Sequence, residues 1–145
     1  MKKVTQALLA ARRLKRAYAK EFEGLCAREG LTAPQVDILL FLGNNPGHDT
    51  ARDIVELRGL AKSYVSKSIE ELIEKNLLEG LRKEADRRQI HLRLTKAAGP
   101  LLRDAQRIQR DFFERMYQGF SKEEKTQMEA FLQRMTENVA PKNEI

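Results

Sequence analysis

The chain has 145 residues with 27 Lys and Arg, 21 Asp and Glu, two His, one Cys and a net charge of +6. This length suits a single domain over 1–145. One cysteine cannot form an internal disulfide, so we expect a reducing compartment, the cytoplasm. The longest apolar run, Ile38–Leu42, has five residues, and the first helical stretch lacks the apolar centre of a signal peptide. We therefore expect neither a membrane partner nor secretion.

The positive charge is concentrated in two places. Residues 1–30 carry eight basic and three acidic groups, and residues 82–93 carry five basic and two acidic groups. Because binding surfaces are local, this distribution is more informative than the total charge. Mild basicity alone is only weak evidence for a nucleic-acid partner, so the pattern of elements has to supply the rest.

Four helices are predicted before residue 77. Apolar spacings of three and four predict one long amphipathic helix over about 4–28. The Thr-Ala-Pro-Gln capping box at 32–35 opens a second helix, and Thr-Ala-Arg-Asp at 50–53 opens a short third helix that Gly59 stops. After a turn of two or three residues, a fourth helix runs over about 61–76. Its expected apolar face consists of Val65, Ile69, Leu72 and Ile73.

The third and fourth helices, joined by a short turn, have the pattern of a helix-turn-helix, and a β-hairpin follows them. Ile90, Leu92 and Leu94 alternate with polar residues, and this period of two predicts a strand. Its charges gather at the hairpin tip, as in a wing. The helical period then returns over 96–119, and a capping box at 121–124 opens a final helix.

The long terminal helices carry more apolar surface than the residues between them can cover. The simplest cover is a second copy of the chain related by a twofold axis. We therefore expect a homodimer whose interface is built from both ends of the chain.

Three stretches resemble the MarR family of bacterial transcription regulators. They are Leu31-Thr32 at a helix start, the helix-turn-helix over 50–78, and Ala-Asp-Arg-Arg-Gln-Ile-His-Leu-Arg-Leu-Thr at 85–95. The most specific is Asp-Arg-Arg at 86–88, which is similar to the Asp-x-Arg of the family's wing. The family's usual Gly before the first wing strand is Asn76 here, and Asn also tolerates a left-handed C-cap. The family's usual Gly after the Thr-x-x sequence appears here as Gly99, displaced slightly by Ala97-Ala98.

The resemblance implies a mainly α fold with a small β-hairpin wing. A winged helix-turn-helix over 32–95 would be flanked by N- and C-terminal dimerisation helices at 1–30 and 96–140. It also implies a homodimer that binds a pseudo-palindromic double-stranded DNA operator, usually as a repressor, with release by a small-molecule effector or by oxidation.

Small, donor-rich side chains in the first turns of a recognition helix let it approach base edges in the major groove. The helix over 61–76 offers Lys62, Ser63, Tyr64, Ser66 and Lys67. Taken alone, this stretch is explained equally well as a solvated polar face, but its place between a turn and a wing favours DNA contact. Glu70, Glu71 and Glu74 act against binding, although they lie in the half of the helix expected to tilt away from the groove.

At the wing tip, Arg88 is the candidate for entering a minor groove, where narrow walls concentrate negative potential. Asp86 would orient an arginine or the hairpin itself, and Arg87 and Lys83 are candidates for phosphate contacts. A charged tip that only maintains solubility is the alternative.

No pattern predicts an enzyme, a cofactor or a metal site, since a nucleophile–base pair, a phosphate loop and a ligand cluster are all missing. Cys26 is interpreted as structural, because Glu29 and the C-terminal end of its helix disfavour a thiolate. Aromatic residues on the long helices lie where the family's effector cleft would fall, but a core role is the simpler interpretation. These are Tyr18, Phe112, Phe113 and Tyr117.

An alternative function remains open: a winged-helix protein-interaction module, or an antagonist of a related regulator, without operator binding of its own. The acidic second half of the fourth helix favours it. Operator affinity that falls steeply with added salt would distinguish a DNA-binding regulator from such a module.

Overall fold

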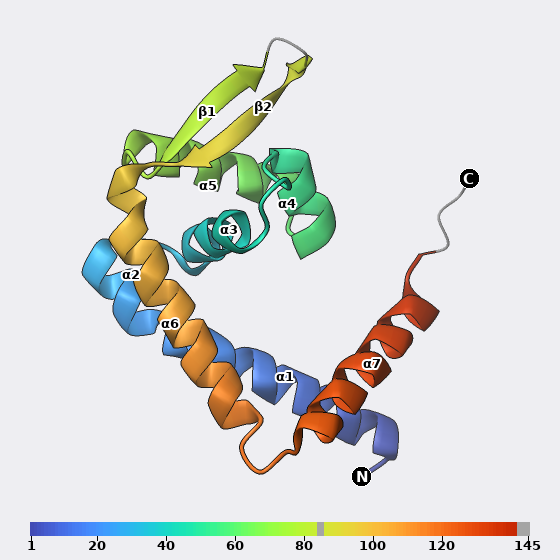
Figure 1. The fold of residues 1–145 in the computed structure, drawn as a ribbon. Coiled ribbons are helices and arrows are strands. Elements are labelled where there is room, and N and C mark those ends of the chain that lie inside the picture. Colours follow the sequence, from blue (N-terminus) through green and yellow to red (C-terminus); the bar gives the residue numbers. More distant parts are fainter. Residues whose placement is uncertain (84–85, 142–145) are drawn as a thin grey trace. The chain divides into compact units, whose positions relative to one another are not determined.

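The computed structural model describes residues 1–83 and 86–141, and the side chains of residues 83, 86 and 87 lie outside this description. The elements are α1 (Lys3–Glu21), α2 (Glu23–Glu29), α3 (Ala33–Asn44), α4 (Ala51–Arg58), α5 (Lys62–Glu74), β1 (Leu78–Lys83), β2 (Asp86–Leu94), a 3-10 turn η1 (Lys96–Ala98), α6 (Gly99–Met116) and α7 (Lys122–Val139). The mainly α fold with a hairpin is confirmed (Figure 1). The chain divides into two compact units, Met1–Arg110 and Asp111–Ile145.

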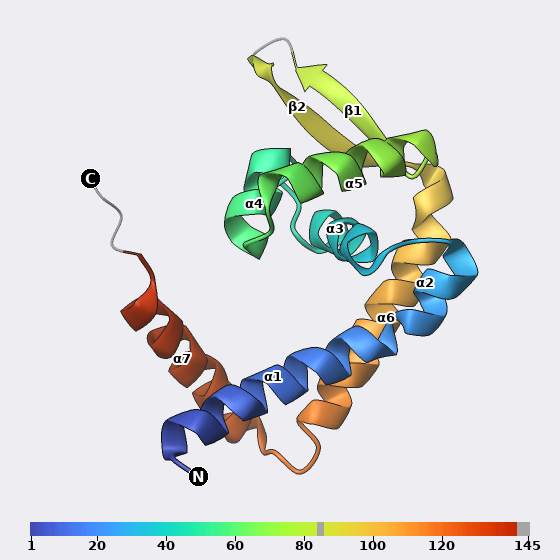
Figure 2. The same ribbon diagram turned by 180° about the vertical axis from the view of Figure 1, so that it is seen from behind.

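Helix α3 is the centre of the first unit. It is apolar around most of its circumference, which is typical of a helix buried on several sides. Its buried apolar side chains are Val36, Ile38, Leu39, Leu40 and Phe41. The helix contacts α2, α5 and β2, and both ribbon views show it beneath α5 (Figures 1 and 2). Its predicted capping box is confirmed: the Gln35 N–H donates to Thr32 Oγ1, and the Thr32 N–H donates to Gln35 Oε1.

Helices α4 and α5 form the predicted helix-turn-helix. Gly59 ends α4 in the left-handed region with φ of 64°, a conformation that favours glycine. One face of α5 is buried, and it consists of Val65, Ser68, Ile69 and Leu72. The expected placement of Ile73 on this face is wrong, because Ile73 is 41% exposed. Positions 65, 68, 69 and 72 follow the i, i+3, i+4, i+7 spacing of one helix face, and residue 73 lies about 100° further round.

The hairpin is fastened to the helix-turn-helix. Strands β1 and β2 pair antiparallel, with Leu78 opposite Leu94. The Leu92 N–H donates to the carbonyl oxygen of Asp49 at 2.7 Å, and His91 Nδ1 lies 2.7 Å from Asp49 Oδ1. These bonds tie β2 to the segment just before α4. Asn76 has φ of 60°, which confirms the left-handed residue expected before β1.

The prediction of one helix over 4–28 is wrong, because the helix is interrupted at Phe22. The Phe22 N–H bonds to the carbonyl of Ala19, which tightens the last turn of α1. The Phe22 ring is buried and packs edge to face on Tyr18, with ring centroids 5.0 Å apart. Gly24, a poor helix former, follows the break. The predicted apolar stripe is kept across the break, but α1 and α2 are two separate helices.

The second unit holds the end of α6 and all of α7. The predicted helix over 96–119 is replaced by η1 and by α6, which ends at Met116. The Tyr117 ring packs edge to face on Phe120, with centroids 5.5 Å apart. Ser121 caps α7 as expected, since its hydroxyl accepts the Glu124 N–H.

Helices α1 and α7 contain no buried residue. Their exposed large apolar side chains are Val4, Leu8 and Leu14 on α1, and Met128, Phe131, Leu132, Met135 and Val139 on α7. Over the part of the chain that is described, no helix has both the length and the apolar character needed to cross a membrane.

The capping box that opens α4 makes a testable contribution to stability. Burial acts to raise the pKa of Asp53, but hydrogen bonds from the Thr50 hydroxyl and backbone N–H outweigh it, and the net pKa is lowered. This stabilisation is present above the ordinary carboxyl pKa of about 4 and is lost as the pH falls through the lowered folded-state value.

We expect Asp53→Asn to lower the free energy of unfolding by about 0.3–1 kcal/mol at neutral pH, the usual contribution of an acidic side chain in the first turn of a helix. The difference from wild type should shrink as the pH falls below about 4. Urea titrations across this pH range measure it. An equal difference in neutral and strongly acidic buffer would contradict the assignment.

Candidate DNA-binding surface

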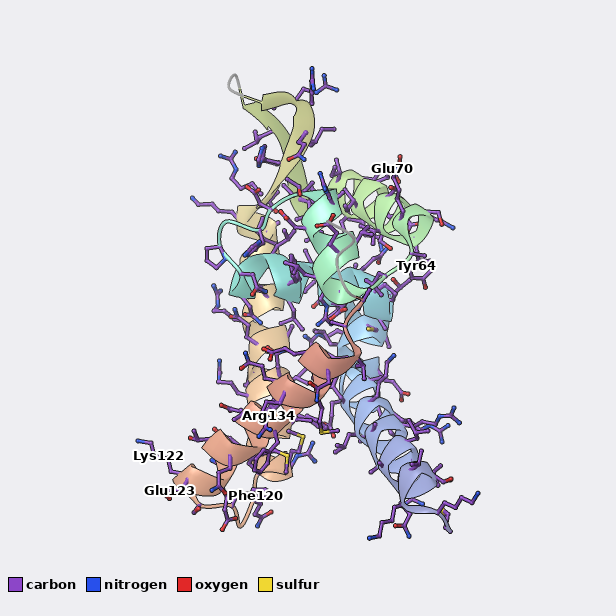
Figure 3. The ribbon with its side chains drawn as sticks, turned by 90° about the vertical axis from the view of Figure 1, so that its right-hand side faces the viewer. Tyr64, Glu70, Phe120, Lys122, Glu123 and Arg134 are labelled. Carbon is purple, nitrogen blue, oxygen red and sulfur yellow. The ribbon has the colours of Figure 1, made fainter. Side chains whose placement is uncertain are left out.

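The first two turns of α5 present polar side chains outward. The five predicted residues on this helix are all exposed: Lys62, Ser63, Tyr64, Ser66 and Lys67. Figure 3 shows Tyr64 and Glu70 pointing away from the body of the first unit. Because the opposite face of α5 is buried, the rotation of the helix about its axis is fixed, and these side chains cannot turn inward.

The N-terminal end of α5 favours anions. Its N-cap residue, Ala61, makes no side-chain hydrogen bond to the first turn, and no acidic residue lies in that turn. The backbone N–H groups and the positive end of the helix dipole therefore remain available to a phosphate oxygen. Lys62 adds a full positive charge at the same end.

The acidic second half of α5 is not uniform. Glu70 is exposed, whereas Glu71 is half-buried and accepts a hydrogen bond from Gln35 Nε2 of α3, with a Nε2–Oε2 distance of 2.5 Å. The other oxygen of Glu71 lies 4.0 Å from Lys67 Nζ. Sequence reasoning missed this contact, because Gln35 signalled only a helix cap.

The wing contributes a second basic surface. Arg88 on β2 is exposed, as is Arg82 on β1. Arg93 is paired across the strands with Glu79, with a nitrogen–oxygen distance of 2.5 Å, so its charge is partly balanced. The side chains of Lys83, Asp86 and Arg87 lie outside the described part of the structure, and their DNA contacts remain predictions.

The hairpin is held to the segment before α4 through residues that sequence reasoning did not assign. Asp49 accepts the Leu92 N–H with its backbone oxygen, and its carboxylate contacts His91. His91 fits the regular polar alternation of β2 and so gave no separate signal, and its partner Asp49 lies 42 residues away in sequence.

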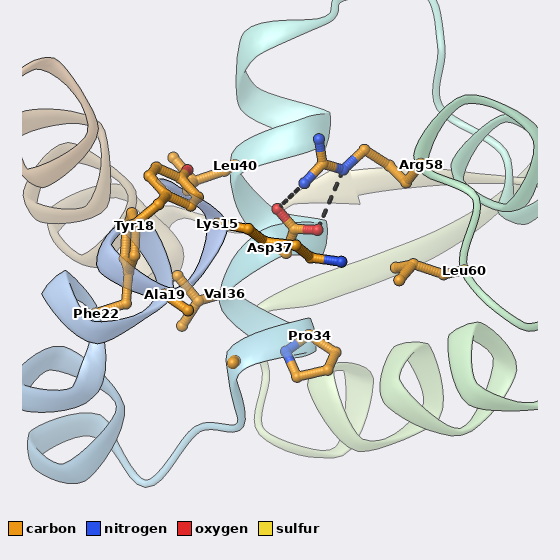
Figure 4. Close-up of a pocket in the computed structure, with 11 residues that line it drawn as sticks. Lys15, Tyr18, Ala19, Phe22, Pro34, Val36, Asp37, Leu40, Arg58 and Leu60 are labelled. Carbon is orange, nitrogen blue, oxygen red and sulfur yellow. Dashed lines mark hydrogen bonds and ion pairs between the residues drawn. The ribbon is translucent and has the colours of Figure 1, made fainter. Parts of the chain in front are cut away.

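A cavity of about 230 Å³ lies between α1, α3 and the C-terminal end of α4 (Figure 4). Its wall is mainly apolar and includes Tyr18, Phe22 and Leu40. On one side, Arg58 Nε donates to Asp37 Oδ2 at 3.1 Å, and a second guanidinium nitrogen bonds the other carboxylate oxygen. This bidentate contact raises the pKa of Arg58. The cavity therefore combines apolar surface with an ion pair at the last residue of α4.

Two other expectations concern chemistry outside this surface. Burial raises the pKa of the Cys26 thiol, so the thiolate is disfavoured, in agreement with a structural role.

Among residues 1–83 and 86–141, no three metal-ligating side chains gather in one place. Of the four aromatic residues considered for an effector cleft, Tyr18 lines the cavity, while Phe112, Phe113 and Tyr117 belong to the second unit.

Comparison with known proteins finds similarity to one family. The profile of the MarR family matches residues 29–89. No curated protein matches the chain. The transcription regulator MarR from Oenococcus oeni PSU-1 is 25% identical, with a TM-score of 0.73 over 93% of this chain and 99% of that chain.

Two further solved structures share the fold. BpsR from Bordetella bronchiseptica, whose DNA binding is regulated by 6-hydroxynicotinic acid, is 23% identical, with a TM-score of 0.71 over 90% of this chain and 98% of that chain. A MarR family regulator from Listeria monocytogenes, complexed with 26mer DNA, is 18% identical, with a TM-score of 0.77 over 96% of this chain and 89% of that chain. The profile match over residues 29–89 and the shared architecture show that this chain is similar to the MarR family of transcriptional regulators and has their winged-helix fold.

Proposed function

We propose that this protein is a homodimeric, sequence-specific regulator that acts in the cytoplasm on double-stranded DNA. It represses transcription from a pseudo-palindromic operator until a small-molecule effector releases it. The observation that carries this proposal is the outward presentation of Lys62, Ser63, Tyr64, Ser66 and Lys67 on a helix whose other face is buried. The DNA-bound relative from Listeria monocytogenes supports it.

Each copy would make two kinds of contact. The first turns of α5 read base edges in the major groove, where every base pair presents a distinct pattern of donors and acceptors. Arg88, with Arg87 and Lys83, holds the wing on the backbone and in the adjacent minor groove, and Asp86 orients the tip. Because the hairpin is bonded to the segment before α4, both contacts move as one body.

A second copy completes the proposed regulator. The exposed apolar side chains of α1 and α7 make the terminal helices, 1–30 and 96–140, the proposed dimer interface. Two recognition helices about 34 Å apart would then meet successive major grooves on one side of the duplex.

The cavity beside α1 is the proposed effector site. BpsR, which shares the fold, is regulated by a small aromatic acid, 6-hydroxynicotinic acid. In this chain, a ligand that bonds Arg58 would compete with Asp37 at the residue directly before the turn into α5. Loss of the Arg58–Asp37 contact would release the end of α4, and with it the start of α5, from α3. An effector that binds better to this shifted state would lower operator affinity.

Selection of bound fragments from random or genomic DNA tests the proposed function. We expect an inverted repeat, with an affinity that falls steeply as salt rises because several phosphate contacts release counterions. Recovery of no duplex, even in dilute buffer, would favour the protein-interaction module instead.

We expect Arg88→Ala to weaken binding to the selected operator by about 1–3 kcal/mol, the range of one good contact. Fluorescence anisotropy measures the change. Arg13→Ala, which removes the same charge from an exposed position on the face of α1 opposite Val4, Leu8 and Leu14, is the matched control and should leave the affinity nearly unchanged. Equal effects of the two substitutions would show that only net charge matters.

We expect a mass of twice 16.7 kDa in size-exclusion chromatography with light scattering. Phe131→Glu should shift the protein toward the monomer, because it places a charge in the apolar face of α7. Thr126→Glu, an exposed position on the opposite face of α7, is the control. A wild-type monomer at micromolar concentration would contradict the proposed dimer.

A further inference from the structure

Gln35 is a buried polar residue with two separate partners. It lies on α3, and only 1% of its surface is exposed. Its side-chain oxygen accepts the Thr32 N–H at 3.0 Å and completes the cap of α3. Its amide nitrogen donates to Glu71 Oε2 at 2.5 Å. A buried amide without partners is costly, so the geometry of Gln35 depends on both contacts.

Glu71 is the matching residue on α5. One carboxylate oxygen is held by Gln35, and the other lies 4.0 Å from the amino group of Lys67, one helical turn earlier. The Lys67 side chain is 76% exposed, so its amino group stays at the surface while Glu71 lies between it and α3. Glu70, the next residue back along the helix, is exposed and points outward (Figure 3).

We propose that Gln35 and Glu71 are positioning residues for DNA recognition. Gln35 keeps the Glu71 carboxylate against α3, and Glu71 in turn restrains the Lys67 amino group on the surface offered to DNA. This inference rests on the proposed function, since it assigns a DNA contact to Lys67.

The electrostatic reason is the position of the carboxylate. A carboxylate that rotates toward the groove repels the phosphates, and this repulsion is strong where water is excluded. A carboxylate held on α3 by a charge-assisted hydrogen bond is kept from that position, and it lowers the number of rotamers open to the neighbouring lysine. Glu71 thus supports binding although its charge has the wrong sign for DNA.

A swap of donor and acceptor tests the contact. Gln35→Glu keeps the oxygen that caps α3 but replaces the amide donor with a second carboxylate facing Glu71. We expect operator affinity to fall about 10-fold or more, as for a lost hydrogen bond to a charged group. Adding Glu71→Gln to this variant restores a donor–acceptor pair with reversed direction, and affinity should return to within about three-fold of wild type.

Glu70→Gln is the matched control, because it removes the same charge from an exposed site on the same helix. It should not lower affinity and should not rescue Gln35→Glu. Rescue by Glu70→Gln equal to that by Glu71→Gln would overturn the inference, since total charge would then explain the effect.

Lys67→Gln supplies the readout that distinguishes positioning from stability alone. The factor by which Lys67→Gln lowers operator affinity should be smaller in the Glu71→Gln variant than in wild type, because Glu71 no longer restrains Lys67 in that variant. This comparison does not require Gln35→Glu to fold. If Lys67→Gln lowers operator affinity by the same factor in wild type and in Glu71→Gln, the inference is overturned. It is also overturned if Glu71→Gln raises operator affinity as much as Glu70→Gln does. If wild type binds no duplex, the proposed function fails as well; if wild type binds and only these comparisons fail, the proposed function stands.

Discussion

Burial of one face of α5 on α3 decides which side chains of the helix can reach a partner. Val65, Ile69 and Leu72 are removed from water, and each buried aliphatic side chain of this size contributes roughly 1.5–3 kcal/mol. A rotation of the helix by even one position would expose this face and bury lysine. The hydrophobic core therefore fixes the outward direction of the residues proposed to read DNA, although the core residues themselves face away from that surface.

Polar contacts add precision that the apolar face cannot supply. Apolar packing tolerates small shifts, whereas hydrogen bonds such as Gln35–Glu71 and Leu92–Asp49 fix distance and direction. The first joins α5 to α3, and the second joins the wing to the segment before α4. Together they make the helix-turn-helix and the wing one body, so that a groove contact at one end sets the position of the other. The Arg58–Asp37 pair lies in the same body and borders the cavity.

The sequence predicted the features that depend on neighbours along the chain. Both capping boxes before residue 60, the left-handed Asn76 and the exposed first turns of α5 depend on local spacing, and all are confirmed. The break at Phe22 could not be predicted, because the apolar spacing of three and four continues through it without interruption. The partners of Gln35 and His91 lie 36 and 42 residues away, and no local pattern encodes such contacts. The wing-tip contacts of Lys83, Asp86 and Arg87 stay predictions.

Hydrogen exchange of the whole protein, with and without a selected operator duplex, tests most directly whether the fixed outward face of α5 is the DNA-reading surface. We expect added duplex to slow exchange in the first turns of α5 and in the hairpin, with little change in α7. Slowed exchange confined to other helices, with α5 and the hairpin unaffected under saturating duplex, would contradict this assignment.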